Sequence, residues 1–521
     1  MGPFFLSMRA AQRRLSSSST AKQLAQESLT PLAYLILPNL PLLFLRSKLT
    51  LVPHGIINIE CLLVGVCSLF LPRLLVFLLL LAEIAGSFAY ELCYSFQIRF
   101  VDLLASLRSA GDLPMLRKEE MLIALATMAG MAALVAFGLR PPRHRRWVAT
   151  ALLGLVVLLS AFDVWDGQNP LLNAQVQRAS ERLTLSPWVT LGIRARALTR
   201  EESQGLLRDS PMPSATSAMM AMLSVRSEQN NPDVVVVVVE SWGELTDLHL
   251  QETMTSPYRD PAIEAAYDVR YGTTPFDGMT VPGELRELCH SHLGFGVLHI
   301  SKTQEQRCLP DEYRAQGYQT EAIHGYVGGM FQREDWYKNL GFEKTWFARD
   351  LAAQGLPECP GAFPGICDPA IADWIGQSLL RSPRVQPRFV YWMTLNSHIP
   401  LPLDPELPTD DLCRSRPVLG QSQALCSWFR VVHALHVGVA KLTIQVKQQP
   451  TVFVLVGDHA PPFANPALRQ YFSDTAVPWI ILTPKALRNL PEQERATVQI
   501  PGKRTPRQAA SRSMSGTGQG Q

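Results

Sequence analysis

The stretch from Val234 to Val239 consists of six consecutive valines, and Glu240 follows it directly. β-Branched residues favour strands, and a strand without polar alternation is typical of a parallel sheet that is covered on both faces. A carboxylate at the end of such a strand is costly to bury unless another group pairs with it. The run therefore predicts an α/β fold, and the partner of Glu240 becomes the first question about function.

Four further apolar segments are expected to form strands, at residues 318–324, 388–395, 451–459 and 477–484. Segments with helical spacing lie between several of them, such as 308–317 and 368–382. This alternation predicts a mostly parallel sheet covered by helices. Ligands of open α/β sheets bind beyond the carboxyl ends of the strands. The polar residues at these ends are Glu240, His324, His398, Asp458 and His459. Their carboxylate and imidazole groups suit one divalent ion, zinc or manganese.

The first third of the chain has a different composition. Five apolar runs lie between residues 31 and 165, and most approach the ~17–25 residues that a membrane-spanning helix needs. Hydrophobic residues make up 47% of the chain and charged residues 18%, which suits a membrane part joined to a soluble part. The net charge of +3 gives no support for nucleic-acid binding. We therefore expect a membrane domain of about five transmembrane helices in residues 1–166.

Basic residues predict the orientation of these helices. The loop from Arg140 to Arg146 reads RPPRHRR and is expected on the cytoplasmic side, as is the basic N-terminus. The 93–119 loop would lie outside the cytoplasm in this arrangement, and its basic residues argue against that placement. With five spans, everything after residue 166 lies outside the cytoplasm. Glu83, within the third apolar run, is either a functional group or a polar contact between helices.

Three more regions follow the expected membrane domain. Residues 167–230 are expected to be a connector with an amphipathic helix at 171–183, and residues 231–490 to form the α/β domain, called the outer domain below. The tail, residues 491–521, has little apolar content after Pro501 and is expected to be disordered.

Five motifs of the outer domain, in this order, resemble the alkaline phosphatase and sulfatase superfamily. The similarity is to its membrane-anchored branch of lipoteichoic acid synthases and of phosphoglycerol and phosphoethanolamine transferases. The motifs are VVVVVVESWG (234–243), GMTVPGELREL (278–288), AIHGYVGGMFQREDWYKNLGF (322–342), TLNSHIPLPL (394–403) and LVGDHAPP (455–462). The resemblance implies an alkaline-phosphatase-like α/β/α domain.

The resemblance also implies a role for each site residue. The metal ligands would be Glu240, Thr280, Asp458 and His459, with Thr280 also the nucleophile. His324 and Arg333 would bind substrate phosphate. His398 would be an active-site histidine that binds substrate or moves a proton.

The implied activity is transfer of a phospholipid head group, phosphoglycerol or phosphoethanolamine, through a phosphothreonine intermediate. The donor would be a membrane phospholipid and the acceptor a periplasmic glycan or lipid, with a multi-pass protein in the bacterial inner membrane and its catalytic domain in the periplasm. Two alternatives stay open: a metal-dependent hydrolase of phosphate or sulfate esters, and a non-catalytic relative that binds a glycan. A formylglycine sulfatase is disfavoured, because threonine at position 280 cannot become formylglycine and the arginine of that motif is absent.

Several residues near these motifs have alternative interpretations. Thr273 and Thr274 also lie close to the nucleophile segment, but the glycine two positions before Thr280 favours Thr280. The remaining histidines of the region are interpreted as structural: His290, His292, His299, His433 and His436.

Six cysteines fall in the outer domain, and an even number in an exported domain suggests disulfides. Pairing in sequence order is the simplest expectation, with buried free thiols as the alternative. The cysteines are Cys289, Cys308, Cys359, Cys367, Cys413 and Cys426.

Overall fold

The computed structural model describes most of the chain after residue 231 and parts of the chain before it. The described residues are 36–40, 57–95, 118–138, 145–166, 184–185, 212–223, 231–276, 278–291, 300–302, 306–361, 363–381, 386–399, 401, 411–414, 416–420, 422–463 and 466–488.

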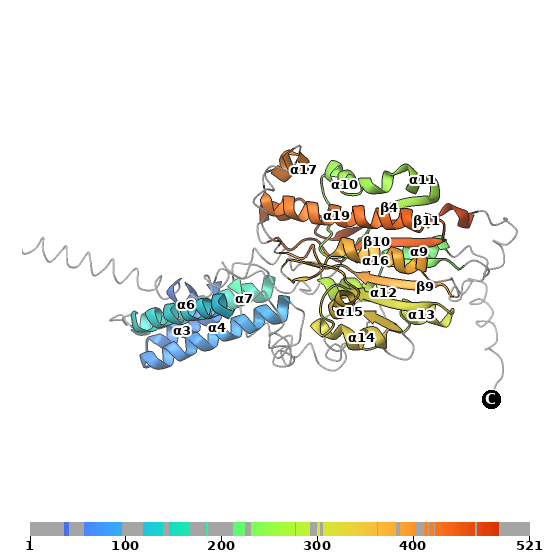
Figure 1. Ribbon diagram of the computed structural model, residues 1–521. Coiled ribbons are helices and arrows are strands. Elements are labelled where there is room, and N and C mark those ends of the chain that lie inside the picture. The colour runs from blue at the N-terminus through green and yellow to red at the C-terminus, as the bar shows by residue number, and fades with distance from the viewer. Residues whose placement is uncertain are drawn as a thin grey trace, which may run out of the picture.

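A seven-stranded sheet forms the centre of the α/β part (Figure 1). Its strand order is β4-β11-β10-β3-β9-β5-β6. The strands are β3 (Asp233–Val239), β4 (Tyr267–Pro275), β5 (Gln319–His324), β6 (Lys344–Trp346), β9 (Arg388–Met393), β10 (Thr451–Gly457) and β11 (Ala476–Pro484). The five strands from β10 to β6 pair in parallel, whereas β11 pairs antiparallel with both β10 and β4. The expected α/β fold with a mostly parallel sheet is confirmed.

The valine run forms β3 in the middle of the sheet, between β10 and β9. All seven of its residues are buried, as a strand covered on both faces requires. Because β3, β5, β9 and β10 run parallel, their carboxyl ends lie at one edge of the sheet. The polar residues that follow these strands are thereby brought to the same end of the domain.

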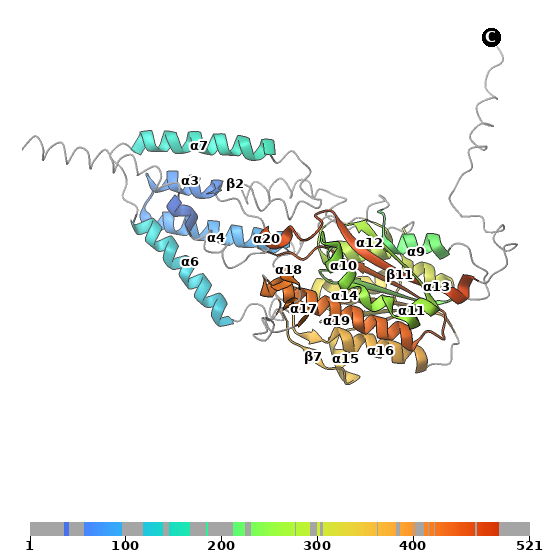
Figure 2. The same ribbon diagram turned by 90° about the horizontal axis from the view of Figure 1, so that it is seen from above.

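Helices cover both faces of the sheet, and Figure 2 shows α16 and α19 on one side and α9 and α12 on the other. The helices of this part are α9 (Ala215–Leu223), α10 (Leu248–Met254), α11 (Pro261–Ala266), α12 (Thr280–Cys289), α13 (Leu309–Ala315), α14 (Arg333–Asn339), α15 (Ala348–Ala353), α16 (Asp368–Arg381), α17 (Asp411–Arg414), α18 (Pro417–Gly420), α19 (Gln423–Gln445) and α20 (Pro466–Arg469). A small hairpin joins β7 (Glu358–Cys359) to β8 (Gly365–Ile366).

Four α-helices are described in the first third of the chain: α3 (Ile59–Ser68), α4 (Arg73–Ser95), α6 (Lys118–Gly138) and α7 (Arg145–Asp166). A short parallel pair links β1 (Ile57–Asn58) to β2 (Thr184–Leu185). Within the part of the chain that the structure describes, none of the helices combines the length and the apolarity that crossing a membrane requires. The five expected spans remain a prediction, and the expected amphipathic helix at 171–183 and the tail at 491–521 lie outside the described residues.

Glu83 takes a structural place in this first third. Its side chain is buried in α4 and accepts hydrogen bonds from Asn58 Nδ2 at 2.9 Å and from Ser87 Oγ at 3.2 Å. Asn58 in turn caps the start of α3. The carboxylate therefore joins two helices, as the second interpretation of this residue expected.

Three disulfides bind the outer domain, and they follow the expected sequence order. The pairs are Cys289–Cys308, Cys359–Cys367 and Cys413–Cys426. The first pair fixes the end of α12, and the second closes the hairpin between β7 and the start of α16. The alternative of buried free thiols is wrong for these six residues.

Candidate metal centre

Glu240 follows β3 directly, and the residue is 3% exposed. The backbone around it is held by the turn after β9, since Glu240 N donates to Thr394 Oγ1 at 2.9 Å and Ser397 Oγ donates to the Glu240 carbonyl at 2.5 Å. Ser241 adopts a left-handed conformation, with φ of 53°, and its hydroxyl donates to Glu240 Oε1 at 2.8 Å. The strained turn directs both residues toward the end of β10.

Asp458 follows β10, the neighbour of β3 in the sheet. Its Oδ1 atom accepts backbone N–H groups from Ser241 at 2.7 Å and from His459 at 2.6 Å. Its Oδ2 atom is buried and has no hydrogen-bond partner among the described residues. A buried carboxylate oxygen without a donor is costly, so Oδ2 is suited to a cation.

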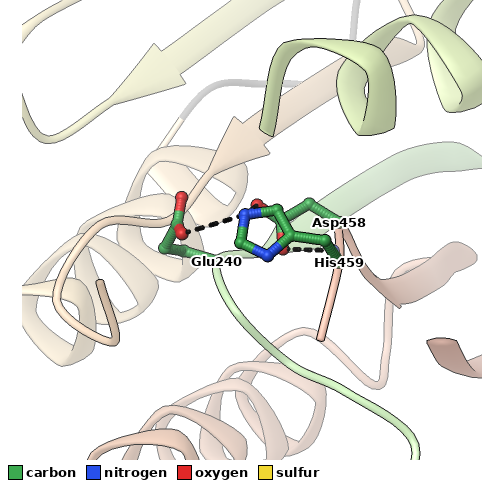
Figure 3. Close-up of side chains that lie close together, drawn as sticks. All are labelled: Glu240, Asp458 and His459. Atoms are coloured by element: carbon green, nitrogen blue, oxygen red, sulfur yellow. Dashed lines mark hydrogen bonds and ion pairs between the residues drawn. The ribbon is translucent and has the colours of Figure 1, made fainter. Parts of the chain in front are cut away.

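His459 completes the group (Figure 3). Its Nδ1–H donates to the Ala460 carbonyl at 2.8 Å, which leaves the lone pair on Nε2. Nε2 lies 3.4 Å from Asp458 Oδ2 and 3.6 Å from Glu240 Oε1. Hydrogen bonding of one ring nitrogen is the usual way in which a protein orients a metal-binding histidine.

These three side chains fit a divalent ion. Their ligand atoms all lie within 4.8 Å of one another, and all three residues are buried. Two carboxylates and one imidazole are ligands that zinc and manganese both accept. The orphaned Asp458 Oδ2 and the fixed tautomer of His459 are the two observations that favour a cation at this place.

Burial and mutual repulsion perturb the pKa values of this group. Burial and the nearby Glu240 charge hold the pKa of Asp458 well above its usual range. Burial also acts to raise the pKa of Glu240, but His398 and His459, together with hydrogen bonds from Ser241 and Thr280, lower it overall. Burial lowers the pKa of His459, so its imidazole is neutral and able to bind a metal. A cation between the two carboxylates would relieve their repulsion.

Thr280 is the first residue of α12, and its side chain lies beside the candidate metal ligands. Its hydroxyl donates to Glu240 Oε2 at 3.2 Å and lies 3.4 Å from His459 Nε2. Thr273 and Thr274 belong instead to the edge strand β4, where the Thr274 hydroxyl donates to the Pro213 carbonyl. Among these three threonines, Thr280 is the one whose hydroxyl lies beside the candidate metal ligands, and its role as nucleophile stays a prediction.

His398 lies in the turn after β9, with its N–H donating to the Leu395 carbonyl at 3.1 Å. The edge of its ring packs on Phe363, with the ring centroids 4.5 Å apart. It is near enough to Glu240 to lower the pKa of that carboxyl group. His398 therefore lies close to the Glu240 carboxylate.

Asp368, which the sequence motifs did not point to, holds the turn that carries His398. This buried carboxylate accepts the N–H groups of Leu395, at 3.0 Å, and of Asn396, at 2.7 Å. Burial raises its pKa to about 7, and the negative charge of Glu240 adds to the rise. Its position at the start of α16, next to Cys367, was the available signal, because acidic residues favour the first turn of a helix.

His324 ends β5 and is fully enclosed. Its Nδ1–H donates to the Met393 carbonyl at 3.1 Å, which leaves Nε2 as a hydrogen-bond acceptor. Burial lowers its pKa to about 3, and the positive charge of Arg333 contributes. The ring is therefore neutral over the physiological range.

Arg333 has a buried partner that the sequence did not reveal. Its Nε and Nη2 atoms donate to Glu284 Oε1 at 3.0 and 2.7 Å, and Glu284 Oε2 accepts the hydroxyls of Tyr337 at 2.5 Å and of Tyr391 at 2.9 Å. Both charged side chains are almost completely buried. Two of the three guanidinium nitrogens are therefore used to hold α12, the helix that carries Thr280. Contact with a substrate phosphate, as the resemblance implies, would fall to Nη1.

Three of the five histidines that were interpreted as structural are described, and each makes contacts within the domain. His290 ends α12, and its Nδ1 atom lies 2.8 Å from Ser214 Oγ. His436 is buried between Trp242 and Tyr258, and His433 stacks on Phe429. His292 and His299 lie outside the described residues.

Comparison with solved structures finds matches at low sequence identity and with TM-scores below 0.5. The lipoteichoic acid synthase LtaP from Listeria monocytogenes is 13% identical, covers 51% of this chain and 71% of its own, and has a TM-score of 0.38. The phosphoglycerol transferase GacH of Streptococcus pyogenes, in complex with sn-glycerol-1-phosphate, is 17% identical, covers 54% and 78%, and has a TM-score of 0.37. The periplasmic domain of EcEptC from Escherichia coli, in complex with zinc, is 13% identical, covers 50% and 76%, and has a TM-score of 0.34.

A search of curated protein sequences finds no match. The family model described as sulfatase matches residues 232–501, which is just over half of the chain. The match begins at the start of β3 and includes every residue of the candidate site. The chain therefore belongs to the sulfatase family.

Proposed function

We propose that this protein is a metal-dependent transferase that moves a phospholipid head group, phosphoglycerol or phosphoethanolamine, to a glycan or lipid acceptor. One observation carries the proposal: the hydroxyl of Thr280 lies against Glu240 and His459, two of the three candidate metal ligands. The nucleophile of the proposed reaction is thus an unmodified threonine, which formylglycine chemistry cannot use.

The metal would be held by Glu240, Asp458, His459 and Thr280, and its charge would make the threonine hydroxyl a stronger nucleophile near neutral pH. Glu240 holds that hydroxyl in place through its Oε2 atom. Attack of Thr280 Oγ on the donor phosphorus would form a new P–O bond and break the bond to diacylglycerol, while the threonine proton passes to Glu240 Oε2. A hydroxyl of the acceptor would then attack the phosphothreonine, and Thr280 would leave with the proton returned from Glu240.

Two histidines would serve the leaving and entering groups. His398, beside Glu240, would protonate the departing alkoxide and take the proton of the acceptor hydroxyl in the second half-reaction. His324 would accept a hydrogen bond through its Nε2 atom, since Nδ1 is committed to Met393. Nη1 of Arg333 would contact a phosphate oxygen.

A membrane anchor belongs to the proposal, because the donor lipid stays in the bilayer. The five apolar runs of residues 31–165 and the basic loop from Arg140 to Arg146 support a multi-pass inner-membrane protein with its catalytic domain in the periplasm. The three disulfides of the outer domain support an oxidising compartment.

Purified full-length protein, incubated with phospholipids that carry a labelled glycerol backbone, tests this function. Release of labelled diacylglycerol from phosphatidylglycerol or phosphatidylethanolamine is expected with Zn²⁺ or Mn²⁺ added. Thr280→Ala should abolish the release, while Thr280→Ser should keep part of it, because serine retains the attacking oxygen. Thr273→Ala is the matched control and should stay near the wild-type rate.

The products distinguish transfer from the alternatives. If the head-group phosphate is transferred to water, at a rate that does not change when a hydroxyl acceptor is added, the protein is a hydrolase instead. Protein that binds metal but releases no diacylglycerol from either lipid would contradict the proposed activity.

A further inference from the structure

Helix α12, which begins with Thr280, also carries Arg286, whose side chain contacts the main chain of the candidate metal ligand Asp458. Arg286 is 1% exposed and points at the end of β10. Its Nη2 atom donates to the Gly457 carbonyl at 2.6 Å, and Nη1 donates to the Asp458 carbonyl at 3.1 Å. One guanidinium therefore binds two successive carbonyls of the turn that supplies a candidate metal ligand.

Helix α12 also packs directly against the turn that carries Asp458. A Cβ atom placed on Gly283 would lie 2.8 Å from Asp458 Cβ and 2.9 Å from Asp458 Cα. Contacts of that length are closer than carbon atoms tolerate, so only glycine lets α12 approach so near. Gly283 and Arg286 thus fix the position of Asp458 against α12, the helix that carries Thr280.

The buried carboxylate of Glu287 fixes the orientation of the Arg286 guanidinium group. Glu287 Oε1 accepts Arg286 Nε at 2.7 Å. Its Oε2 atom accepts the backbone N–H of Thr216 at 3.0 Å, and the Thr216 hydroxyl lies 2.7 Å from the Glu287 carbonyl and 3.1 Å from Oε2. Thr216 lies in α9, so a continuous chain of buried polar contacts runs from α9 through Glu287 and Arg286 to the Asp458 backbone.

We propose that Arg286 is a positioning residue, which sets the place of Asp458 relative to Thr280 and thereby the affinity of the site for its metal. The inference rests on the metal centre of the proposed function and assigns Arg286 no contact with substrate. Groups that orient metal ligands commonly affect metal affinity by ~10–100-fold. Arg286 orients its ligand through the main chain, which the sequence motifs do not reveal.

Metal binding by the full-length protein tests the inference. Titration calorimetry with Zn²⁺ or Mn²⁺, in the absence of lipid, would compare the wild type with Arg286→Lys. Lysine keeps a positive charge beside Glu287 but cannot bind both carbonyls in a fork. We expect metal affinity to fall about tenfold or more.

Arg388→Lys is the matched control. Arg388 is also buried and also donates to a carbonyl, that of Ser378 at 2.9 Å, but it begins β9 at the end of the sheet opposite the metal centre. We expect this control to bind metal within twofold of the wild type. Equal affinities of Arg286→Lys and wild type, or equal losses in both lysine variants, would overturn the inference.

A second variant covers failure of Arg286→Lys to fold. Thr216→Val removes the hydroxyl that bridges the Glu287 carbonyl and its Oε2 atom, without touching any candidate ligand. A weaker metal affinity in this variant supports the chain of contacts, and an unchanged affinity overturns it. Normal metal binding without diacylglycerol release would count against the proposed function alone, whereas a wild type that binds neither ion would contradict both.

Discussion

The buried pair of Glu284 and Arg333 gives the sharpest prediction about the stability of the site. Glu284 is completely buried in α12 and accepts four hydrogen bonds, two of them from Arg333. Glu284→Ala leaves the guanidinium buried without its counter-charge, which costs about 3–5 kcal/mol. It also removes the acceptor of two buried tyrosine hydroxyls, each worth ~1–3 kcal/mol when left unpaired, although these terms do not simply add.

We therefore expect Glu284→Ala to lower the free energy of unfolding of the outer domain by about 4 kcal/mol or more. Urea unfolding with the disulfides intact, followed by the fluorescence of the buried tryptophans, measures this loss. Glu252→Gln is the control, because Glu252 and its partner Arg259 are both more than half exposed. Removal of that exposed pair should change stability by ~1 kcal/mol or less.

A compensating double variant tests the cause of the loss. Arg333→Met combined with Glu284→Leu replaces both charges by apolar groups and should recover part of the stability, since no charge is left unpaired. A loss below ~1 kcal/mol for Glu284→Ala would contradict the reasoning, because an unpaired buried arginine cannot cost so little. So would a double variant that is less stable than both single variants.

Three further predictions concern pH, backbone packing and topology. Burial raises the pKa of Asp368 from its ordinary value of 3.8 to about 7, so the stability that its protonated form contributes should be lost as pH rises through this window. Thermal unfolding of the metal-free protein should show a weaker decline in Asp368→Asn, and a wild-type slope in the exposed Asp373→Asn. Gly283→Ala should weaken metal binding, because the new methyl group would collide with Asp458; unchanged affinity would show that the turn can move away. A reporter enzyme that is active only in the periplasm should be active when fused after Gly167, whereas activity of a cytoplasm-only reporter there would refute the five-span topology.

The sequence predicted the parts of the fold that depend on local pattern. The valine run, the other apolar segments and their polar ends predicted β3, β5, β9 and β10, and hence the group of Glu240, Asp458 and His459. Strand β4 was missed because its residues are mostly half-buried or exposed, as befits the edge of the sheet, so they form no continuous apolar run.

Contacts between distant residues were beyond the sequence. Arg333 and Glu284 are 49 positions apart, and nothing local marks either as a buried ion pair. Arg286 and Glu287 resemble an ordinary solvated face of a helix, since charged residues are seldom buried. Their burial follows from the packing of α12 against α9 and against the turn after β10, which only the three-dimensional structure determines.

A covalent adduct on Thr280 tests the central claim most directly. Full-length protein is incubated with metal and phosphatidylglycerol or phosphatidylethanolamine, without acceptor, and then digested for mass spectrometry. Our account predicts the added mass of the head-group phosphate on the peptide that contains Thr280, and its disappearance after an acceptor is supplied. An adduct on a different residue, or a Thr280→Ala protein that still releases diacylglycerol, would contradict it.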